Sequence, residues 1–117
     1  MARAKVGGSA AEELERLLKR LKRSLKRLCR QEGIEDLSHL RYHTVALSEA
    51  VYRSPGGKTY RRYQLKAYYA DGRRQRTKTV KSWREDDLPQ SVKRIVALYR
   101  AVKHIQRALK SLNELPK

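Results

Sequence analysis

Leucine recurs every three or four residues through the first quarter of the chain, which is the spacing of an apolar seam along one side of a helix. The seam consists of Leu14, Leu18, Leu21, Leu25 and Leu28, and Leu17 broadens it. Ser9 with Glu12 three residues later forms a capping box, and Gly33 is a typical residue just past a helix end. The sequence therefore predicts a helix at about residues 9–32, after a basic arm at residues 1–8 that we expect to be disordered.

A second seam with the same spacing occupies the end of the chain: Ile95, Leu98, Val102, Ile105, Leu109 and Leu112. Asp87 and Gln90 form a second capping box, and Pro89 is tolerated in a first helical turn because its missing N–H would have no partner there. These features predict a long helix at about residues 87–115.

The middle of the chain favours β-strands. Residues 42–53 alternate loosely and contain Thr, Val and Tyr, and a Ser-Pro-Gly-Gly turn follows at residues 54–57. Residues 58–83 form two further strands joined by a tight turn at Asp71-Gly72. We therefore predict an α+β fold in one domain, residues 9–117: a long N-terminal helix, a three-stranded antiparallel meander at about residues 42–83, and a long C-terminal helix.

Two registers are available to the hairpin at Asp71-Gly72. A two-residue loop would place Leu65 opposite Lys78, mixing apolar and charged side chains on one face. A three-residue loop at residues 70–72, with Gly72 left-handed in a bulge, pairs Tyr69 with Arg73 and separates the faces. We favour the three-residue loop, because a one-residue slip would bury cations that have no visible partner.

This register predicts an apolar face on the second strand of the sheet, carrying Tyr63, Leu65, Ala67 and Tyr69. The opposite face is dense in cations and contains no carboxylate, and like charges placed opposite each other destabilise a sheet unless they meet a polyanion. We expect this face to bind nucleic acid through Arg62, Gln64, Lys66, Tyr68, Arg74, Arg76 and Lys78.

The charge of the whole chain supports this expectation. The 117 residues carry a formal net charge of +17, with a pI near 10.5, which is far more than solubility requires and indicates an anionic partner. The first helix is rich in cations beyond its acidic start. We expect secondary phosphate contacts there from Lys19, Arg20, Arg23 and Arg27.

Motifs of catalysis are missing from the sequence. It has no phosphate-binding glycine loop, no metalloprotease motif and no cysteine cluster. His39, His43 and His104 lack metal-ligand spacing, and the lone Cys29 is expected to be a small buried hydrophobe on the first helix. We therefore expect no enzymatic activity, no cofactor and no metal. No apolar run is long enough to cross a membrane, so we expect a cytoplasmic, nucleoid-associated protein, or a virion-associated one if it is viral.

The segment GGKTYRRYQLKAYYADGRRQRTKTVKSW, residues 56–83, resembles the three-stranded sheets of AP2-type domains and of integrase arm-binding domains. Those families lay a sheet face into the DNA major groove. The resemblance covers about a quarter of the chain and does not include the long basic first helix. It implies that the DNA-contacting face carries Arg62, Lys66, Tyr68, Arg74, Arg76 and Lys78.

Three functions stay open from the sequence. Duplex DNA binding in a transcriptional, architectural or packaging role comes first, and RNA binding second, because RNA is often bound by stacking on several aromatics and only Tyr68 is expected on this face. The third is a helical assembly module for an acidic partner.

The surplus of apolar helix face favours a homodimer through the helices, although the two seams would also be satisfied by packing on each other within the chain. The chain contains few Asn, Cys and Met residues and many charged residues. This composition is typical of proteins from hyperthermophiles and indicates an archaeal or mobile-element origin.

Overall fold

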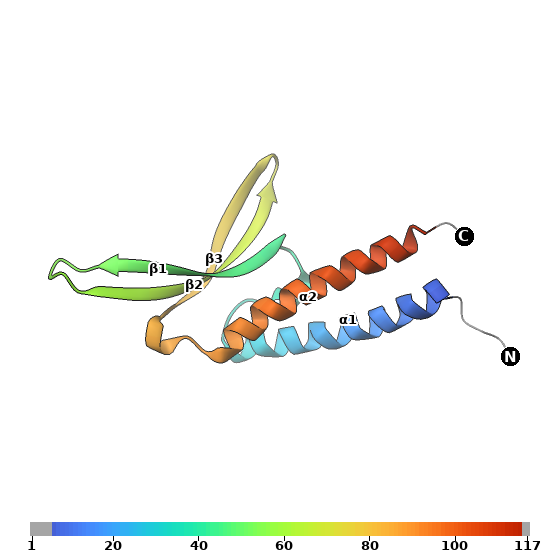
Figure 1. Ribbon diagram of the computed structural model, residues 1–117, viewed down its shortest axis with the longest axis horizontal. Helices are drawn as coiled ribbons and strands as arrows, with labels where there is room; N and C mark the ends of the chain where they lie inside the picture. Colours follow the sequence, from blue (N-terminus) through green and yellow to red (C-terminus); the bar gives the residue numbers. More distant parts are fainter. Residues whose placement is uncertain (1–5, 116–117) are drawn as a thin grey trace.

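The computed structural model describes the backbone of residues 6–115 and the side chains from Ala10 onward. Its elements follow the predicted order of helix, three strands and helix (Figure 1). They are α1 (Val6–Gln31), the 3₁₀ turn η1 (Leu37–His39), β1 (Thr44–Arg53), β2 (Thr59–Asp71), β3 (Arg74–Arg84), the 3₁₀ turn η2 (Glu85–Asp87) and α2 (Gln90–Asn113). The α+β fold is confirmed.

The two ends of α1 differ in how well the sequence predicts them. The helix begins at Val6, so Ser9 lies inside it and the predicted capping box is wrong. Gly7 and Gly8, which precede Ser9, are poor helix formers, yet both lie inside α1. Residues 6–8, predicted to be part of the arm, are therefore helical, while residues 1–5 lie outside the described part. The predicted end is confirmed: Gly33 has a φ of 66°, and the Ile34 N–H donates to the Cys29 carbonyl at 3.0 Å.

The start of α2 also differs from the prediction. Asp87 belongs to η2 rather than capping α2, and no side chain caps this helix. Leu88 and Pro89 are both extended, with ψ values of 114° and 148°. A residue that precedes proline is disfavoured in helical geometry, so the helix starts only after Pro89.

The sheet is an antiparallel meander in the order β1-β2-β3, as predicted. At the first turn, the Ser54 N–H donates to the Lys58 carbonyl at 2.8 Å, and Gly57 has a φ of 83°. β1 pairs with residues 59–68 of β2, whereas β3 pairs with residues 62–71. The two hairpins therefore share the middle of β2 and project from it as separate arms, which diverge in Figure 1.

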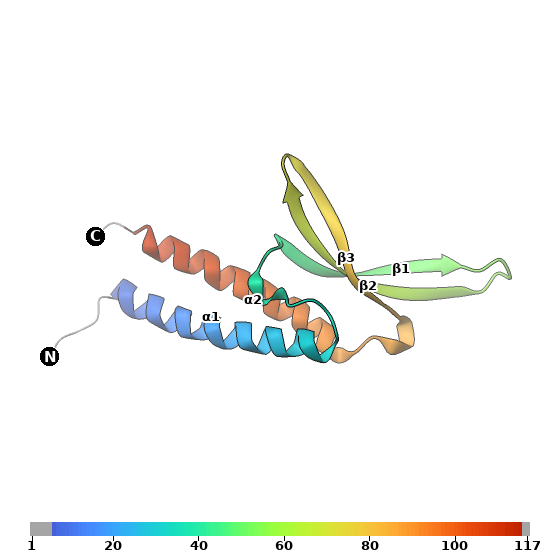
Figure 2. The same ribbon diagram turned by 180° about the vertical axis from the view of Figure 1, so that it is seen from behind.

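The two helices pack side by side within the chain and run antiparallel, so that the start of α1 lies near the end of α2 (Figures 1 and 2). The sheet lies near the other end of this helical hairpin, and Figure 2 shows the link between α1 and β1 crossing beside the helices. The molecule is elongated, with extents of 75 × 33 × 18 Å. The core joins all three parts through Leu25 and Cys29 of α1, Val45, Leu65 and Ala67 of the sheet, and Val92, Ile95 and Tyr99 of α2.

Cys29 is fully buried in this core, as expected for a small hydrophobe. Burial raises the pKa of its thiol, even though a backbone hydrogen bond at Leu37 acts in the opposite direction. The protonated thiol therefore behaves as an apolar group.

Candidate nucleic-acid interface

The β2–β3 hairpin has a register that differs from both alternatives considered above. Asp71 pairs with Arg74, so the loop consists of Gly72 and Arg73, and Gly72 has a φ of 65°. Tyr69 consequently lies opposite Arg76 rather than Arg73. The predicted three-residue loop is wrong.

A bulge in β3 alters the register a second time. Thr79 pairs with Lys66 and Lys81 pairs with Leu65, so Val80 is an extra residue without a partner in β2. The two-residue loop sets Lys78 opposite Ala67, and the insertion sets Lys81 opposite Leu65. Ala67 and Leu65 are both fully buried. Two lysines are therefore on the inner side of the sheet, the side that faces the helices.

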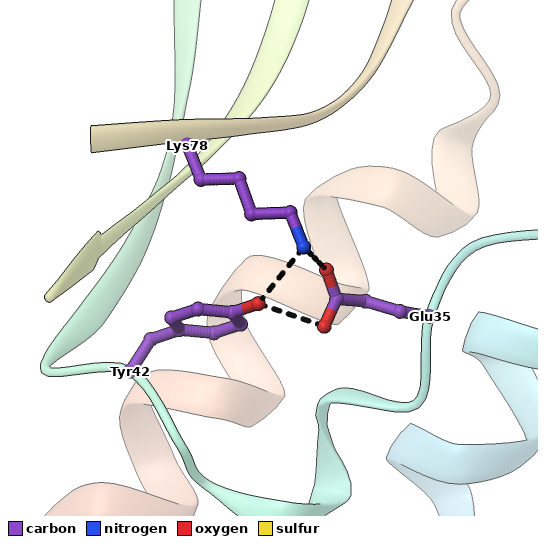
Figure 3. A network of polar contacts seen from close by, with 3 residues as sticks. All are labelled: Glu35, Tyr42 and Lys78. Atoms are coloured by element: carbon purple, nitrogen blue, oxygen red, sulfur yellow. Dashed lines mark hydrogen bonds and ion pairs between the residues drawn. The ribbon is translucent and has the colours of Figure 1, made fainter.

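Lys78 finds its partners in the link between α1 and β1 (Figure 3). Its ammonium donates to the Glu35 carboxylate at 2.9 Å and to the Tyr42 hydroxyl at 3.3 Å, while that hydroxyl donates to Glu35 at 2.8 Å. The hydrogen bond to Glu35 raises the pKa of Lys78. Burial would raise the pKa of Glu35, but the hydrogen bonds from Lys78 and Tyr42 outweigh it and lower that pKa.

Tyr42 is itself held by α2. Its backbone N–H donates to the Tyr99 hydroxyl at 3.0 Å, and that hydroxyl donates to the Tyr42 carbonyl at 2.5 Å. Tyr99 is fully buried, so these two bonds satisfy polar groups that water does not reach. The link is thereby fixed on α2, and through Glu35 it fixes β3.

Lys81 is also satisfied by the link. Its ammonium donates to the Glu32 carbonyl at 2.8 Å and lies 5.6 Å from the centre of the Trp83 ring. The reason for rejecting an inner position for these lysines was the lack of a visible partner. That reason fails because the partners, Glu32, Glu35 and Tyr42, belong to a different segment.

Further from the helices, inner-side arginines are paired as well. Arg61 lies 3.1 Å from the Glu49 carboxylate, and Arg76 lies 2.9 Å from that of Asp71. With Lys78 and Lys81, four cations on the inner side thus have a partner of opposite charge or a carbonyl.

The outer side has a different composition. Alternation along the strands places Arg62, Lys66 and Arg84 there, together with Gln64 and Tyr68. No strand residue on this side is Asp or Glu, and none of the three cations pairs with a carboxylate of the described residues. Arg62 donates instead to the Ser82 hydroxyl at 3.1 Å. The adjacent positions of β1 are small: Ala46, Ser48 and Ala50.

Two tyrosines extend this outer side along the β1–β2 arm. Tyr52 and Tyr60 pair across the strands and stack, with ring centroids 5.5 Å apart and planes 18° apart. They are 39% and 49% exposed. Tyr60, Arg62 and Arg84 also line an open hollow, together with Arg61 and with Glu85 and Asp86 of η2.

The predicted binding face is therefore divided between two sides of the sheet. Arg62, Gln64, Lys66 and Tyr68 share the outer side, as predicted. Arg74, Arg76 and Lys78 lie on the inner side, because the two-residue loop reverses the expected facing of this part of β3. Sequence reasoning missed Arg84, Tyr52 and Tyr60. The turn at residues 54–57 contained the signal for the tyrosines, because it sets Tyr52 opposite Tyr60.

The helix cations predicted as secondary contacts, Lys19, Arg20, Arg23 and Arg27, are all exposed on α1. Within the described residues, no group of three or more potential ligands is placed to hold a metal ion. Neither long helix in the described part is apolar enough to cross a membrane.

Comparison with known proteins returned no matching family model, no matching curated protein and no matching solved structure.

Proposed function

We propose that this chain is a non-enzymatic nucleic-acid-binding protein that contacts duplex DNA with the outer side of its sheet. The supporting observation is the contrast in pairing between the two sides. Four inner-side cations, Arg61, Arg76, Lys78 and Lys81, have partners within the chain. Arg62, Lys66 and Arg84 on the outer side have no carboxylate partner among the described residues. Phosphate groups of a polyanion would supply the missing negative charge.

The shape of the sheet fits this partner. A two-stranded β-ribbon enters the major groove of DNA, and the small side chains of β1 leave the β2 side chains prominent. In this arrangement Arg62 and Gln64 have the donors and acceptors that contact guanine and adenine edges, while Lys66 contacts phosphate. Arg74, near the tip of the β2–β3 arm, and the exposed cations of α1 add phosphate contacts. Such a protein would act on the nucleoid, or inside a virion if it is viral.

The test compares two double variants that remove the same charge. Arg62→Ala with Lys66→Ala removes two of the three outer-side cations, and Arg61→Ala with Arg76→Ala removes two paired inner-side cations. Each phosphate contact contributes about 0.9 to the log–log salt slope of duplex affinity, so the outer variant should lose about 0.9 through Lys66. Loss of the Arg62 base contact should further weaken affinity for a preferred site by about 1–3 kcal/mol. The inner variant should change the slope little. Equal losses for the two variants, at unchanged folding by circular dichroism, would refute the outer side as the binding surface.

A second candidate, single-stranded RNA, rests on the tyrosines. The sequence favoured DNA over RNA because only one aromatic residue was expected on the binding face. In the structure, Tyr52, Tyr60 and Tyr68 all lie on the outer side of the sheet. Exposed aromatic rings stack on unpaired bases, at about 1–3 kcal/mol per base.

This candidate predicts that Tyr60→Ala weakens single-stranded RNA binding by about tenfold or more, with an unchanged salt slope. Val51→Ala is the matched control, because Val51 is 60% exposed on the same arm but lies on the inner side. If duplex DNA affinity falls instead and RNA affinity does not, the tyrosines serve the first function.

A further inference from the structure

The helical hairpin has one apolar side that nothing in the described chain covers. On α2 the half-buried residues of this side are Leu98, Ala101, Ile105, Ala108 and Leu112. On α1 they are Leu14, Leu21, Ser24 and Leu28, with Leu17 at 38% exposure. Both sets alternate three and four residues apart, the spacing of a helix-packing seam. We call these two sets together the open stripe.

Leu28 and Leu98 of the open stripe also pack against the core, and the stripe continues from them along the two helices. Ala101 follows the fully buried Val92 by about two and a half turns, which places the two on opposite sides of α2. Ser24, Leu28, Leu98 and Ala101 line a shallow groove between the helices, bordered by Arg27 and Arg94. Leu28 is thus near Leu98. Equal rise in two antiparallel helices then sets Leu21 level with Ile105.

We propose that a second copy of this chain covers the open stripe, forming a two-fold, four-helix interface. The open stripes of two copies have the same seam spacing, so each stripe is complementary to its counterpart. A two-fold interface requires such self-complementarity. Leucine and isoleucine alternate with alanine on α2, so large side chains of one copy face small ones of the other.

The flanking charges select the direction of pairing. Glu13, Arg20 and Arg27 follow one another at seven-residue intervals beside the α1 half of the stripe, and all three are exposed. If α1 lies antiparallel over α1 of the second copy, with the axis near Arg20, Glu13 lies level with Arg27 of the second copy. This attraction occurs twice, against one repulsion where Arg20 meets Arg20 of the second copy. The other two-fold arrangement, α1 over α2 of the second copy, would set Arg27 level with Arg100. Opposite charges therefore favour the first arrangement.

The remaining cations of α1 do not oppose this pairing. Lys19, Arg23 and Lys26 are exposed on another side of α1, away from Leu21 and Leu28. They stay in solvent when the stripe is covered. The antiparallel arrangement also places the two sheets at opposite ends of the bundle, so both outer sides stay accessible.

Sedimentation equilibrium of nuclease-treated protein tests the interface without any nucleic acid, so its outcome is separate from that of the proposed function. The wild type should sediment at twice the chain mass of 13.7 kDa at micromolar concentration. Ala101→Arg and Leu17→Arg should both be folded monomers, because each places a charge in the stripe. Gln106→Arg, which adds the same group at an exposed position outside the stripe, should stay dimeric. A monomeric wild type, or dimeric stripe variants, would overturn the proposal.

A charge exchange tests the direction. Glu13→Arg and Arg27→Glu should each raise the dimer dissociation constant about tenfold, because two symmetric attractions become repulsions. The double variant should recover the wild-type constant. Failure of the double variant to recover would overturn the antiparallel arrangement.

Discussion

The ammonium of Lys78 lies 2.9 Å from the carboxylate of Glu35, a residue 43 positions earlier in the chain (Figure 3). This ion pair connects β3 to the link that follows α1, and Tyr42 connects the same link to α2. It holds Lys78 on the inner side of the sheet, whereas the sequence led us to expect Lys78 on the same face as Arg62 and Lys66.

The pair predicts a pH dependence of stability. The pKa of Glu35 is lowered from 4.5, so its contribution to the free energy of unfolding is present above about pH 4.5 and is lost as pH falls through the lower folded value. The pKa of Lys78 is raised from 10.5, so its contribution is present below that pH and is lost as pH rises through the higher folded value.

Urea unfolding across this pH range measures both limbs. Glu35→Gln should be less stable than the wild type at neutral pH and should show a flatter acid limb, whereas Lys78→Met should flatten the alkaline limb. Glu12→Gln, at an exposed position of α1, is the control and should retain both limbs. An acid limb of Glu35→Gln as steep as that of the wild type would show that the pair contributes nothing.

Leu65 and Lys66 are neighbours with opposite facing, so their truncations should differ. Leu65 is fully buried, and Leu65→Ala should lower the free energy of unfolding by about 2–5 kcal/mol. Lys66→Ala on the outer side should change it by about 0.5 kcal/mol or less. Chemical denaturation of both variants checks this. Equal losses would be inconsistent with the facing described for β2.

This facing of β2 was predictable from the sequence, whereas that of β3 was not. Alternation along residues 63–69 places Leu65 and Ala67 inside regardless of the loop length, because both apolar residues belong to the same strand. The facing of Lys78 depends instead on a two-residue loop and on partners at Glu35 and Tyr42. Hairpin patterns do not contain long-range partners, so an apparently unpaired lysine was assigned to solvent.

The ends of the helices show the same distinction. Gly33 terminates α1 through its own left-handed backbone, a property of a single residue. The capping boxes at Ser9 and Asp87 were predicted from residue spacing alone, and neither forms, since local backbone geometry at Pro89 and the extension of α1 to Val6 decide those boundaries.

Val80 is the extra residue of the bulge, so its deletion should keep the facing of β3. Without Val80, Lys78 and Trp83 are four positions apart, and regular alternation still places both on the inner side. Deletion of Thr79 and Val80 together would instead set Lys78 and Trp83 on opposite sides. Trp83 is only 7% exposed, so its displacement should lower the free energy of unfolding by about 3–5 kcal/mol. Thermal unfolding compares the two variants, and equal losses would argue against the bulge at Val80.

Tyr99→Phe should be costly although it removes a single oxygen. The Tyr42 N–H and carbonyl both bond to the Tyr99 hydroxyl and would be left without it. Unsatisfied buried groups cost about 1–3 kcal/mol. Tyr52→Phe, at an exposed tyrosine, should be nearly neutral. Denaturant unfolding measures the comparison through the midpoints, provided that the variants unfold with the same denaturant slope. A Tyr99→Phe variant as stable as the wild type would mean that water replaces the hydroxyl.

The shared use of β2 by two hairpins has a consequence for internal motion. Only residues 62–68 of β2 are paired on both edges, and the arms beyond them have one partner each. Amide hydrogens in residues 62–68 should therefore exchange with solvent at rates set by global unfolding. Those at the two tips should exchange through small local openings that leave the rest folded. The two arms should thus bend independently of each other about the doubly paired centre of β2. Such bending would let the sheet follow the curvature of a long partner without unfolding the core.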